Sequence, residues 1–135
     1  MLDLDEIAEA YLRHHAQHND ADFWAWQEVD QIVRANHELD RAWEITLLLL
    51  RKAETDEVLS YVAAGPLEDV IDIYADKAMD LIEQACDKDT RLQLALSGVW
   101  LESDSPVLGR WRALMTKYGF QDGSRPPLSR HPDCL

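Results

Sequence analysis

Apolar residues recur along most of the chain at intervals of three and four positions, which is the spacing of one face of an α-helix. The first series, which predicts a helix over about 3–18, consists of Leu4, Ile7, Ala8, Tyr11 and Leu12. Asp3 and Glu6 stand in the capping-box positions at its start. No segment alternates apolar and polar residues with the two-residue period of a β-strand, so the pattern predicts an all-α protein.

Seven further helices are expected after the first. Their ranges are about 23–36, 38–53, 55–65, 66–74, 75–86, 92–100 and 106–119. Gly65 is expected to cap one helix in a left-handed conformation, and Pro66 to begin the next. The periodicity leaves open whether a break falls near Tyr74 or whether the two helices around it are continuous. Eight short helices joined by tight turns predict antiparallel pairs, stacked as in an α-solenoid or packed as an irregular bundle.

The last part of the chain carries a different pattern. Residues 120–135 contain Pro126, Pro127 and Pro132 and show too little periodicity for a helix. Because 135 residues is a common size for one domain, we expect a single helical domain over 1–119 and a tail over 120–135. This tail is expected to wrap the surface or to be disordered, and its removal to leave the fold intact.

Five tryptophans distinguish the chain from a disordered acidic sequence. Trp26, Trp43, Trp100 and Trp111 fall in the apolar stripes and are expected in the core. Trp24 falls off the stripe of its helix. It is a candidate for an exposed interface anchor, with packing against the next helix pair as the alternative.

Acidic side chains dominate the charge of the molecule. The formal net charge is −13 at pH 7. Residues 1–105 hold 24 acidic and 8 basic side chains, whereas residues 106–135 hold 2 and 5. A field of this sign repels nucleic acid and anionic lipid and attracts cationic surfaces. We therefore expect a basic protein partner, no direct contact with nucleic acid and no membrane partner.

The sequence also bears on where the protein works. Its N-terminus opens with acidic residues where a signal peptide needs basic ones. The longest strongly apolar stretch, 45–50, is far shorter than the roughly 20 residues of a membrane span. Cys86 and Cys134 form no disulfide framework or zinc spacing. These features predict a soluble protein of a reducing, cytoplasmic compartment.

A row of acidic residues is the most suggestive functional pattern. Asp69, Asp72, Asp76, Asp80, Glu83 and Asp87 follow one another at spacings of 3, 4, 4, 3 and 4 residues. If the helices around Tyr74 are continuous or nearly coaxial, these carboxylates share one face, here called the acidic ridge, with only Lys77 and Lys88 nearby in sequence. The predicted partner-binding residues are Asp69, Asp72, Asp76, Asp80 and Glu83, with Trp24 as the apolar anchor. The alternative is an ordinary solvated helix face.

The sequence carries no catalytic or cofactor signature. His14 and His18 lie one helical turn apart, a spacing that can hold a transition metal, but His15 stands where a zinc hydrolase needs a glutamate base. Phosphate loops, nucleophile elbows and di-iron pairs are missing. We expect no enzyme activity, no metal and no cofactor, and a metal-dependent enzyme stays only as a further alternative.

One motif carries a family resemblance. It is the run Ala63-Ala64-Gly65-Pro66-Leu67-Glu68-Asp69, accompanied by Phe23-Trp24-Ala25-Trp26, Ala42-Trp43, Ile82-Glu83, Arg91 and Val99-Trp100. Over about residues 8–112 the sequence thereby resembles an uncharacterised family of small bacterial proteins. The resemblance implies a helical bacterial cytoplasmic domain and supplies no activity.

Small size, acidity and missing catalytic chemistry together favour a non-catalytic binding module. The leading interpretation is an immunity or antitoxin-type protein that neutralises a basic toxin or nuclease. The alternative is an acidic nucleic-acid mimic that occupies a DNA-binding or phage-defence protein.

Overall fold

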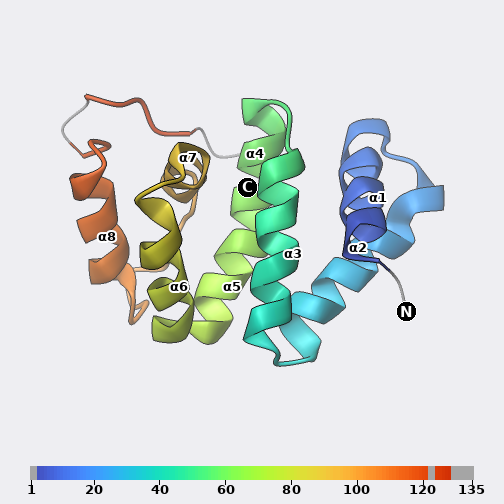
Figure 1. Cartoon of the computed structure of the whole chain (residues 1–135), viewed down its shortest axis with the longest axis horizontal. Coiled ribbons are helices and arrows are strands. Elements are labelled where there is room, and N and C mark those ends of the chain that lie inside the picture. Colours follow the sequence, from blue (N-terminus) through green and yellow to red (C-terminus); the bar gives the residue numbers. More distant parts are fainter. Residues whose placement is uncertain (1–2, 122–123, 129–135) are drawn as a thin grey trace.

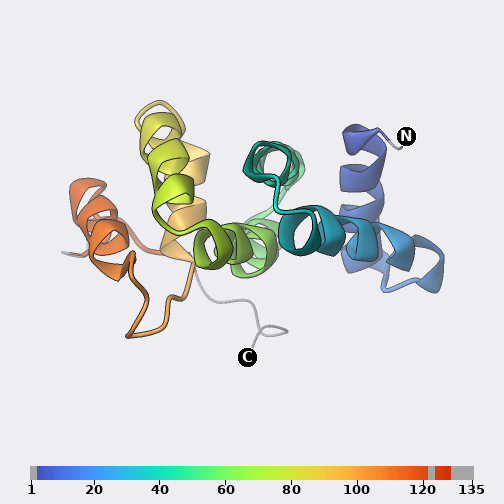
Figure 2. The same cartoon turned by 90° about the horizontal axis from the view of Figure 1, so that it is seen from below.

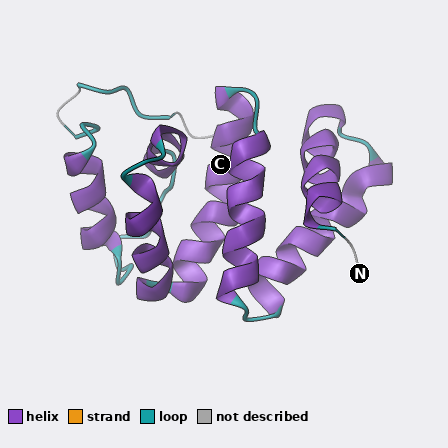
Figure 3. Ribbon diagram, viewed as in Figure 1, coloured by secondary structure: helices purple, strands orange, loops and turns teal. Residues whose placement is uncertain are grey.

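The computed structural model describes residues 3–121 and 124–128, and all regular structure in these ranges is helical (Figure 3). The α-helices are α1 (Leu4–Gln17), α2 (Phe23–Asp30), α3 (Leu39–Lys52), α4 (Asp56–Val62), α5 (Glu68–Tyr74), α6 (Asp76–Cys86), α7 (Thr90–Ser97) and α8 (Leu108–Lys117). They lie side by side in an extended row, with α1 and α2 at one end and α8 at the other (Figures 1 and 2). The all-α fold expected from the sequence is confirmed.

Local signals position most of the helix ends. Asp3 caps α1, where its carboxylate accepts a hydrogen bond from the Asp5 amide at 3.0 Å. Thr55 and Asp89 cap α4 and α7 in the same way, with side-chain oxygens 3.2 and 3.0 Å from backbone amides three residues on. The predicted starts of these three helices are therefore close to the observed ones.

The prediction that Gly65 caps a helix and Pro66 begins another is wrong. A π-helical turn, Ala63–Leu67, joins α4 to α5, so Pro66 lies inside a continuing helix. The Glu68 amide reaches back to the Ala63 carbonyl, a five-residue hydrogen bond that accommodates a proline without ending the helix. Burial of apolar residues on both sides of this turn outweighs the local tendency of Gly-Pro to stop a helix.

The break left open by the sequence falls one residue after Tyr74. Ala75 has φ 49° and ψ −120°, a conformation that no helix contains. As a result α5 and α6 run in clearly different directions (Figures 1 and 2). The acidic ridge is thereby split between two helices that are not coaxial.

The hydrophobic core follows the row of helices from end to end. Fully buried side chains contributed by α1, α3, α4, α5, α6 and α7 include Ile7, Ile45, Leu49, Leu59, Ile71, Ile82 and Leu96. The helix α1 packs against α2 and α3, whereas α6 packs against α7 and α8. No helix in the described ranges is long and apolar enough to cross a membrane.

Part of the predicted tail belongs to the core. Phe120 and Leu128 are both buried. The Leu128 amide donates to the Ser97 hydroxyl at 2.8 Å, and the Arg125 guanidinium lies over the Phe120 ring at 4.3 Å. In its described part the tail wraps the surface, as one of the two expectations had it, but Phe120 and Leu128 are packed. Pro132 lies outside the described residues.

The tryptophans divide differently from the expectation. Trp43 is buried and Trp111 is half-buried with its indole N–H donating to the Leu96 carbonyl. Trp26 and Trp100, expected in the core, are 39% and 60% exposed, so for these two the prediction is wrong. The buried residues of this segment are Ala25, Val29, Ile32 and Val33, so Ala25 takes the buried position expected for Trp26.

Candidate binding cleft

A cleft of about 590 Å³ opens between α1, α2 and the α4–α5 region. Its lining residues are Tyr11, His14, His15, His18, Trp26, Val29, Asp30, Val33, Arg34, Tyr61, Gly65, Pro66 and Asp69. Aromatic rings and a few charged groups therefore meet in one concave site, a composition typical of ligand and partner sites.

One wall of the cleft is a set of packed rings from α1 and α4. The His15 ring stacks on Tyr61 with centroids 3.9 Å apart, and Tyr11 lies 5.7 Å from Tyr61. Tyr11 and His15 are buried, so this wall is held in place by the core. At Gly65 a Cβ atom would lie 3.5 Å from the Tyr11 hydroxyl, so the glycine widens the cleft at this point.

The opposite rim is an aromatic stack on α2. Phe23 and Trp26 lie nearly parallel with ring centroids 5.6 Å apart, and both are substantially exposed. The His14 ring meets Phe23 edge-on at 5.7 Å. Because Phe23, Trp26, Asp30 and Arg34 recur at helical spacing, the same face of this segment carries the rings and then the charges.

A three-residue charge cluster closes the far end of the cleft. Arg34 Nη2 lies 2.6 Å from Asp69 Oδ1, and Arg34 Nε lies 3.2 Å from Asp30 Oδ1. The Asp69 side chain is only 23% exposed. Burial raises the pKa of this carboxyl above its ordinary value, and the Arg34 charge opposes that shift only in part. Asp69 is thus an acid held in a partly desolvated place by one arginine.

The histidines of the cleft have defined neighbours. His14 Nδ1 lies 2.7 Å from the Asn19 carbonyl oxygen, so this nitrogen carries the proton and donates it. His15 and His18 have ring centroids 6.1 Å apart. Within residues 3–121 and 124–128, no three side chains of metal-ligating type gather into a possible metal site. In this cleft His14 donates a hydrogen bond and His15 stacks on Tyr61.

An ion pair between half-exposed Arg13 and buried Asp22 sets the position of α2 against α1. The Arg13 Nε and Nη2 atoms both lie 2.8 Å from carboxylate oxygens of Asp22, which is buried. Asn19 accepts a hydrogen bond from the Asp22 amide at 2.8 Å. The hydrogen bonds from Arg13 hold the pKa of Asp22 below its ordinary value. This corner fixes the distance between the aromatic rim and the wall.

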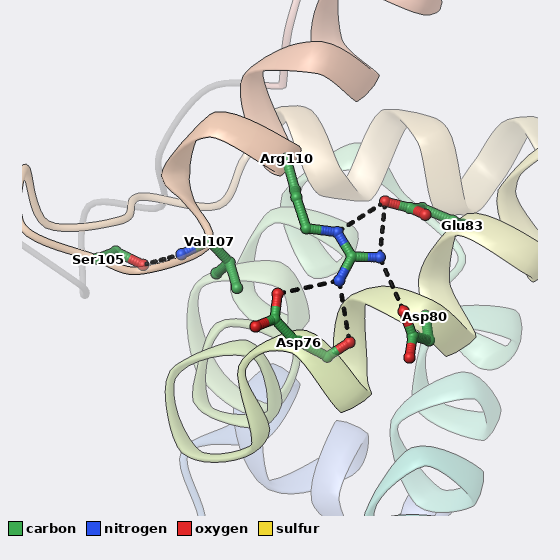
Figure 4. Close-up of polar contacts among 6 residues, drawn as sticks. All are labelled: Asp76, Asp80, Glu83, Ser105, Val107 and Arg110. Carbon is green, nitrogen blue, oxygen red and sulfur yellow. Dashed lines mark hydrogen bonds and ion pairs between the residues drawn. The ribbon is translucent and has the colours of Figure 1, made fainter.

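The acidic ridge meets cations that the sequence analysis missed. Arg110 of α8 binds three of its carboxylates at once: Nη1 lies 3.0 Å from Asp76, and Nη2 lies 2.9 Å from both Asp80 and Glu83 (Figure 4). Asp87 is 2.8 Å from Lys117 Nζ. The premise that only nearby lysines could neutralise the ridge is therefore wrong, because the cations that bind its α6 acids and Asp87 come from about 30 residues further along the chain, and Asp69 is paired with Arg34.

The first two acids of the ridge have separate surroundings. Asp69 lines the cleft, whereas Asp72 is exposed on α5 and does not line it. Partial desolvation raises the pKa of the Asp72 carboxyl; the Arg34 charge opposes that shift, and nearby Glu102 adds to it. Of the predicted partner-binding acids, only Asp69 is thus placed in the cleft.

Comparison with known protein families finds one family whose model matches most of this chain. The model of a family of unknown function, DUF6869, matches residues 13–118. The chain belongs to this family. No curated protein and no solved structure matches the sequence. The matched range contains every lining residue of the cleft except Tyr11, and it includes the Gly-Pro turn that forms part of the floor.

Within the DUF6869 region, the tryptophan that lines the cleft is not Trp24, the predicted anchor. Trp24 is 36% exposed but does not line the cleft, whereas Trp26 does. The signal that could have found the cleft is the helical series Phe23, Trp26, Asp30 and Arg34, which mixes rings and charges on one face. His14 and the 63–69 motif could be assigned to the same site only from the three-dimensional structure.

Proposed function

We propose that this protein is a non-catalytic module that binds a basic protein partner, as an immunity or antitoxin protein binds a toxin or nuclease. The observation that carries this proposal is the cleft itself. It combines the exposed ring of Trp26 with the carboxylates of Asp30 and Asp69, on a chain of net charge −13. Such a site offers both an apolar contact and charge complementarity to a cationic surface.

The net charge still favours a cationic partner, although ion pairs neutralise part of the acidic ridge. Internal ion pairs redistribute the field over the surface but leave the net charge at −13. A partner of opposite sign is therefore attracted over a distance of about 10 Å at 0.1 M salt, and its association is expected to be salt-sensitive. Affinity has to come from elsewhere, because steering charges raise the association rate more than they slow dissociation.

The aromatic rim is the natural source of that affinity. Trp26 and Phe23 form one stacked surface at the mouth of the cleft. Tryptophan is among the residue types that most often dominate the energy of an interface, above all beside a pocket from which water is displaced. Trp26 is therefore the proposed apolar anchor, and Trp24 serves as the control residue.

The nucleic-acid mimic is less well supported than the partner-binding module. A mimic needs regularly spaced carboxylates that face outward in place of phosphates. Asp76, Asp80 and Glu83 bind Arg110 instead, and the break at Ala75 separates them from Asp69 and Asp72 on α5. These contacts give the ridge a role in joining α6 to α8.

A bacterial cytoplasmic location forms part of the proposal. Cys86 is fully buried, and burial raises the pKa of its thiol to about 12, which keeps it in the unreactive protonated form. A structural thiol of this kind is in keeping with a reducing compartment.

Affinity capture with paired variants tests the proposed function. The wild-type protein, Trp26→Ala and Trp24→Ala would each be immobilised and exposed to a lysate of the source cells at low and high salt. We expect the wild type to retain a basic protein at low salt and Trp26→Ala to lose it, with at least a tenfold weaker affinity for the purified partner. Trp24→Ala should retain it.

Two charge variants complete this experiment. Asp69→Asn should weaken binding, whereas Glu44→Gln, which removes an exposed acid on α3, should not. If the retained protein is not basic, or if Trp26→Ala and Asp69→Asn bind it as well as the wild type does, the proposed function is wrong.

A further inference from the structure

We propose that the cleft receives an arginine side chain of the basic partner, and that Arg34 occupies its place in the free protein. This inference rests on the proposed function and adds the chemistry of the recognised group. The cleft brings a guanidinium-binding acid pair, Asp30 and Asp69, together with an exposed aromatic face, Trp26. Guanidinium groups bind carboxylates through several N–H donors and stack on aromatic rings.

The contacts of Arg34 show what kind of group the acid pair accepts. Its guanidinium uses Nη2 on Asp69 at 2.6 Å and Nε on Asp30 at 3.2 Å. The Arg34 side chain is 52% exposed, so solvent and a partner can reach it. Because the Arg34 guanidinium is half exposed and its pair with Asp30 is exposed on both sides, this pair contributes little stability, and Arg34 can be exchanged for a better-placed group of the same kind.

Asp69 gives the exchange a direction. Its carboxylate is partly desolvated, and burial raises its pKa in spite of the Arg34 charge. A second cation that arrives together with apolar surface would exclude more water and strengthen its pairing with this carboxylate. The ionised acid is therefore better matched to a bound partner than to the free protein.

An anionic ligand fits the same cleft less well. At neutral pH the cluster holds two carboxylates and one guanidinium, so an anion would have to displace both acids from Arg34. It would also approach against a net charge of −13. The stacked face of Trp26 and Phe23 adds a surface on which a planar guanidinium gains from cation–π attraction and a compact ammonium gains less planar contact.

A titration with small probes tests this inference without any partner protein. The probes are Nα-acetyl-arginine amide, Nα-acetyl-lysine amide and inorganic phosphate. The readout is the two-dimensional NMR spectrum, with the indole N–H signal of Trp26 assigned by the Trp26→Phe variant. We expect the arginine probe to shift this signal saturably, with the lysine probe about threefold weaker or more and phosphate without effect.

Three variants, with a fourth in reserve, are expected to change the affinity for the arginine probe in different directions. Arg34→Gln removes the internal competitor and should tighten binding of the arginine probe by about threefold or more. Arg112→Gln, an equal charge change on the exposed surface of α8, should leave it unchanged. Asp69→Asn should weaken it about tenfold. Asp30→Asn repeats this test at the other acid if Asp69→Asn does not fold.

The outcomes separate this inference from the proposed function. Absence of a saturable shift with the arginine probe, or weaker binding by Arg34→Gln, overturns the inference. A phosphate response that Arg34→Gln abolishes replaces it with an anion site. If the arginine probe binds as expected while the capture experiment yields no basic protein, the inference stands as a site for a small cationic ligand and the proposed function fails. A captured basic partner with no response to the arginine probe gives the reverse result.

Discussion

Two arginines of this protein each bind several carboxylates, yet they belong to different kinds of surface. Arg110 joins α8 to Asp76, Asp80 and Glu83 of α6, in a contact between helices (Figure 4). Arg34 holds Asp69 at the end of a cleft whose other walls are aromatic. A row of acids in the sequence therefore does not by itself mark a binding surface. The cation that reaches it and the apolar surface beside it decide its role.

The two clusters also differ in how completely their donors are used. Arg110 bonds three carboxylates and the Asp76 carbonyl, which uses its Nε and both terminal nitrogens. Hydrogen bonding to Glu83, and then to Asp80 and Asp76, raises the pKa of this guanidinium. Arg34 makes only two ion pairs and keeps half of its surface in water. The first arrangement holds two helices together, and the second leaves a group that a partner can replace.

The largest expected effect concerns what holds the α6–α8 half together. Leu128→Ala is expected to lower the free energy of unfolding by about 2–4 kcal/mol, because a buried leucine leaves a cavity beside Gly98 and α7. Urea unfolding followed by circular dichroism measures it. If Leu128→Ala lowered the free energy of unfolding by less than Arg110→Gln does, ion pairs rather than apolar packing would hold the α6–α8 half together.

The expectation for Leu128 also shows what periodicity can and cannot predict. Helix types, approximate ends and the absence of strands in the described ranges follow from local spacing and caps. The packing of an aperiodic segment such as 120–128 depends on the surface it meets, which no local pattern encodes. The same holds for Arg110, since contacts across about 30 residues leave no trace in the spacing of the acids.

The candidate site was predictable only in part, for a related reason. Asp69 was selected for its place in a row, and the structure places it in the cleft, where it pairs with Arg34 from the segment after α2. Trp26 was assigned to the core because a helical stripe identifies a face without fixing its angular limits. The wide spacing of cleft residues along the chain, from Tyr11 to Asp69, left no single motif to find.

A smaller effect is expected from Arg110. Arg110→Gln should destabilise the protein by about 1 kcal/mol, since exposed ion pairs contribute little individually but three acids on one helix are left without their shared cation. Arg112→Gln, an exposed arginine two positions away, is the matched control and should cost almost nothing. Repeating both measurements in about 1 M salt should shrink the difference. An effect that salt leaves unchanged would indicate that Arg110 acts through packing of its stem.

The smallest expected effect is an opposite pH dependence of stability for two acids, Asp87 near α8 and Asp69 in the cleft. Hydrogen bonds donated by Lys117 and Tyr118 hold the pKa of Asp87 below its ordinary value of 3.8, whereas burial holds the pKa of Asp69 above that value. A carboxyl with a lowered pKa stabilises the fold above its unfolded pKa, and that contribution is lost as the pH falls through the folded pKa. A carboxyl with a raised pKa binds its proton more tightly in the folded state, so the fold gains stability as the pH falls through it.

Thermal midpoints between about pH 3 and pH 7, measured for the wild type, Asp69→Asn and Asp87→Asn, separate the two cases. The advantage of the wild type over Asp87→Asn should be present at neutral pH and shrink once the pH falls below the ordinary value of 3.8. Relative to Asp69→Asn, the wild type should instead gain stability as the pH falls from neutrality toward that value. Equal pH dependence of the two variants would mean that Asp69 is paired as fully as Asp87. The cleft would then contain no partly desolvated carboxylate that a cationic partner could stabilise.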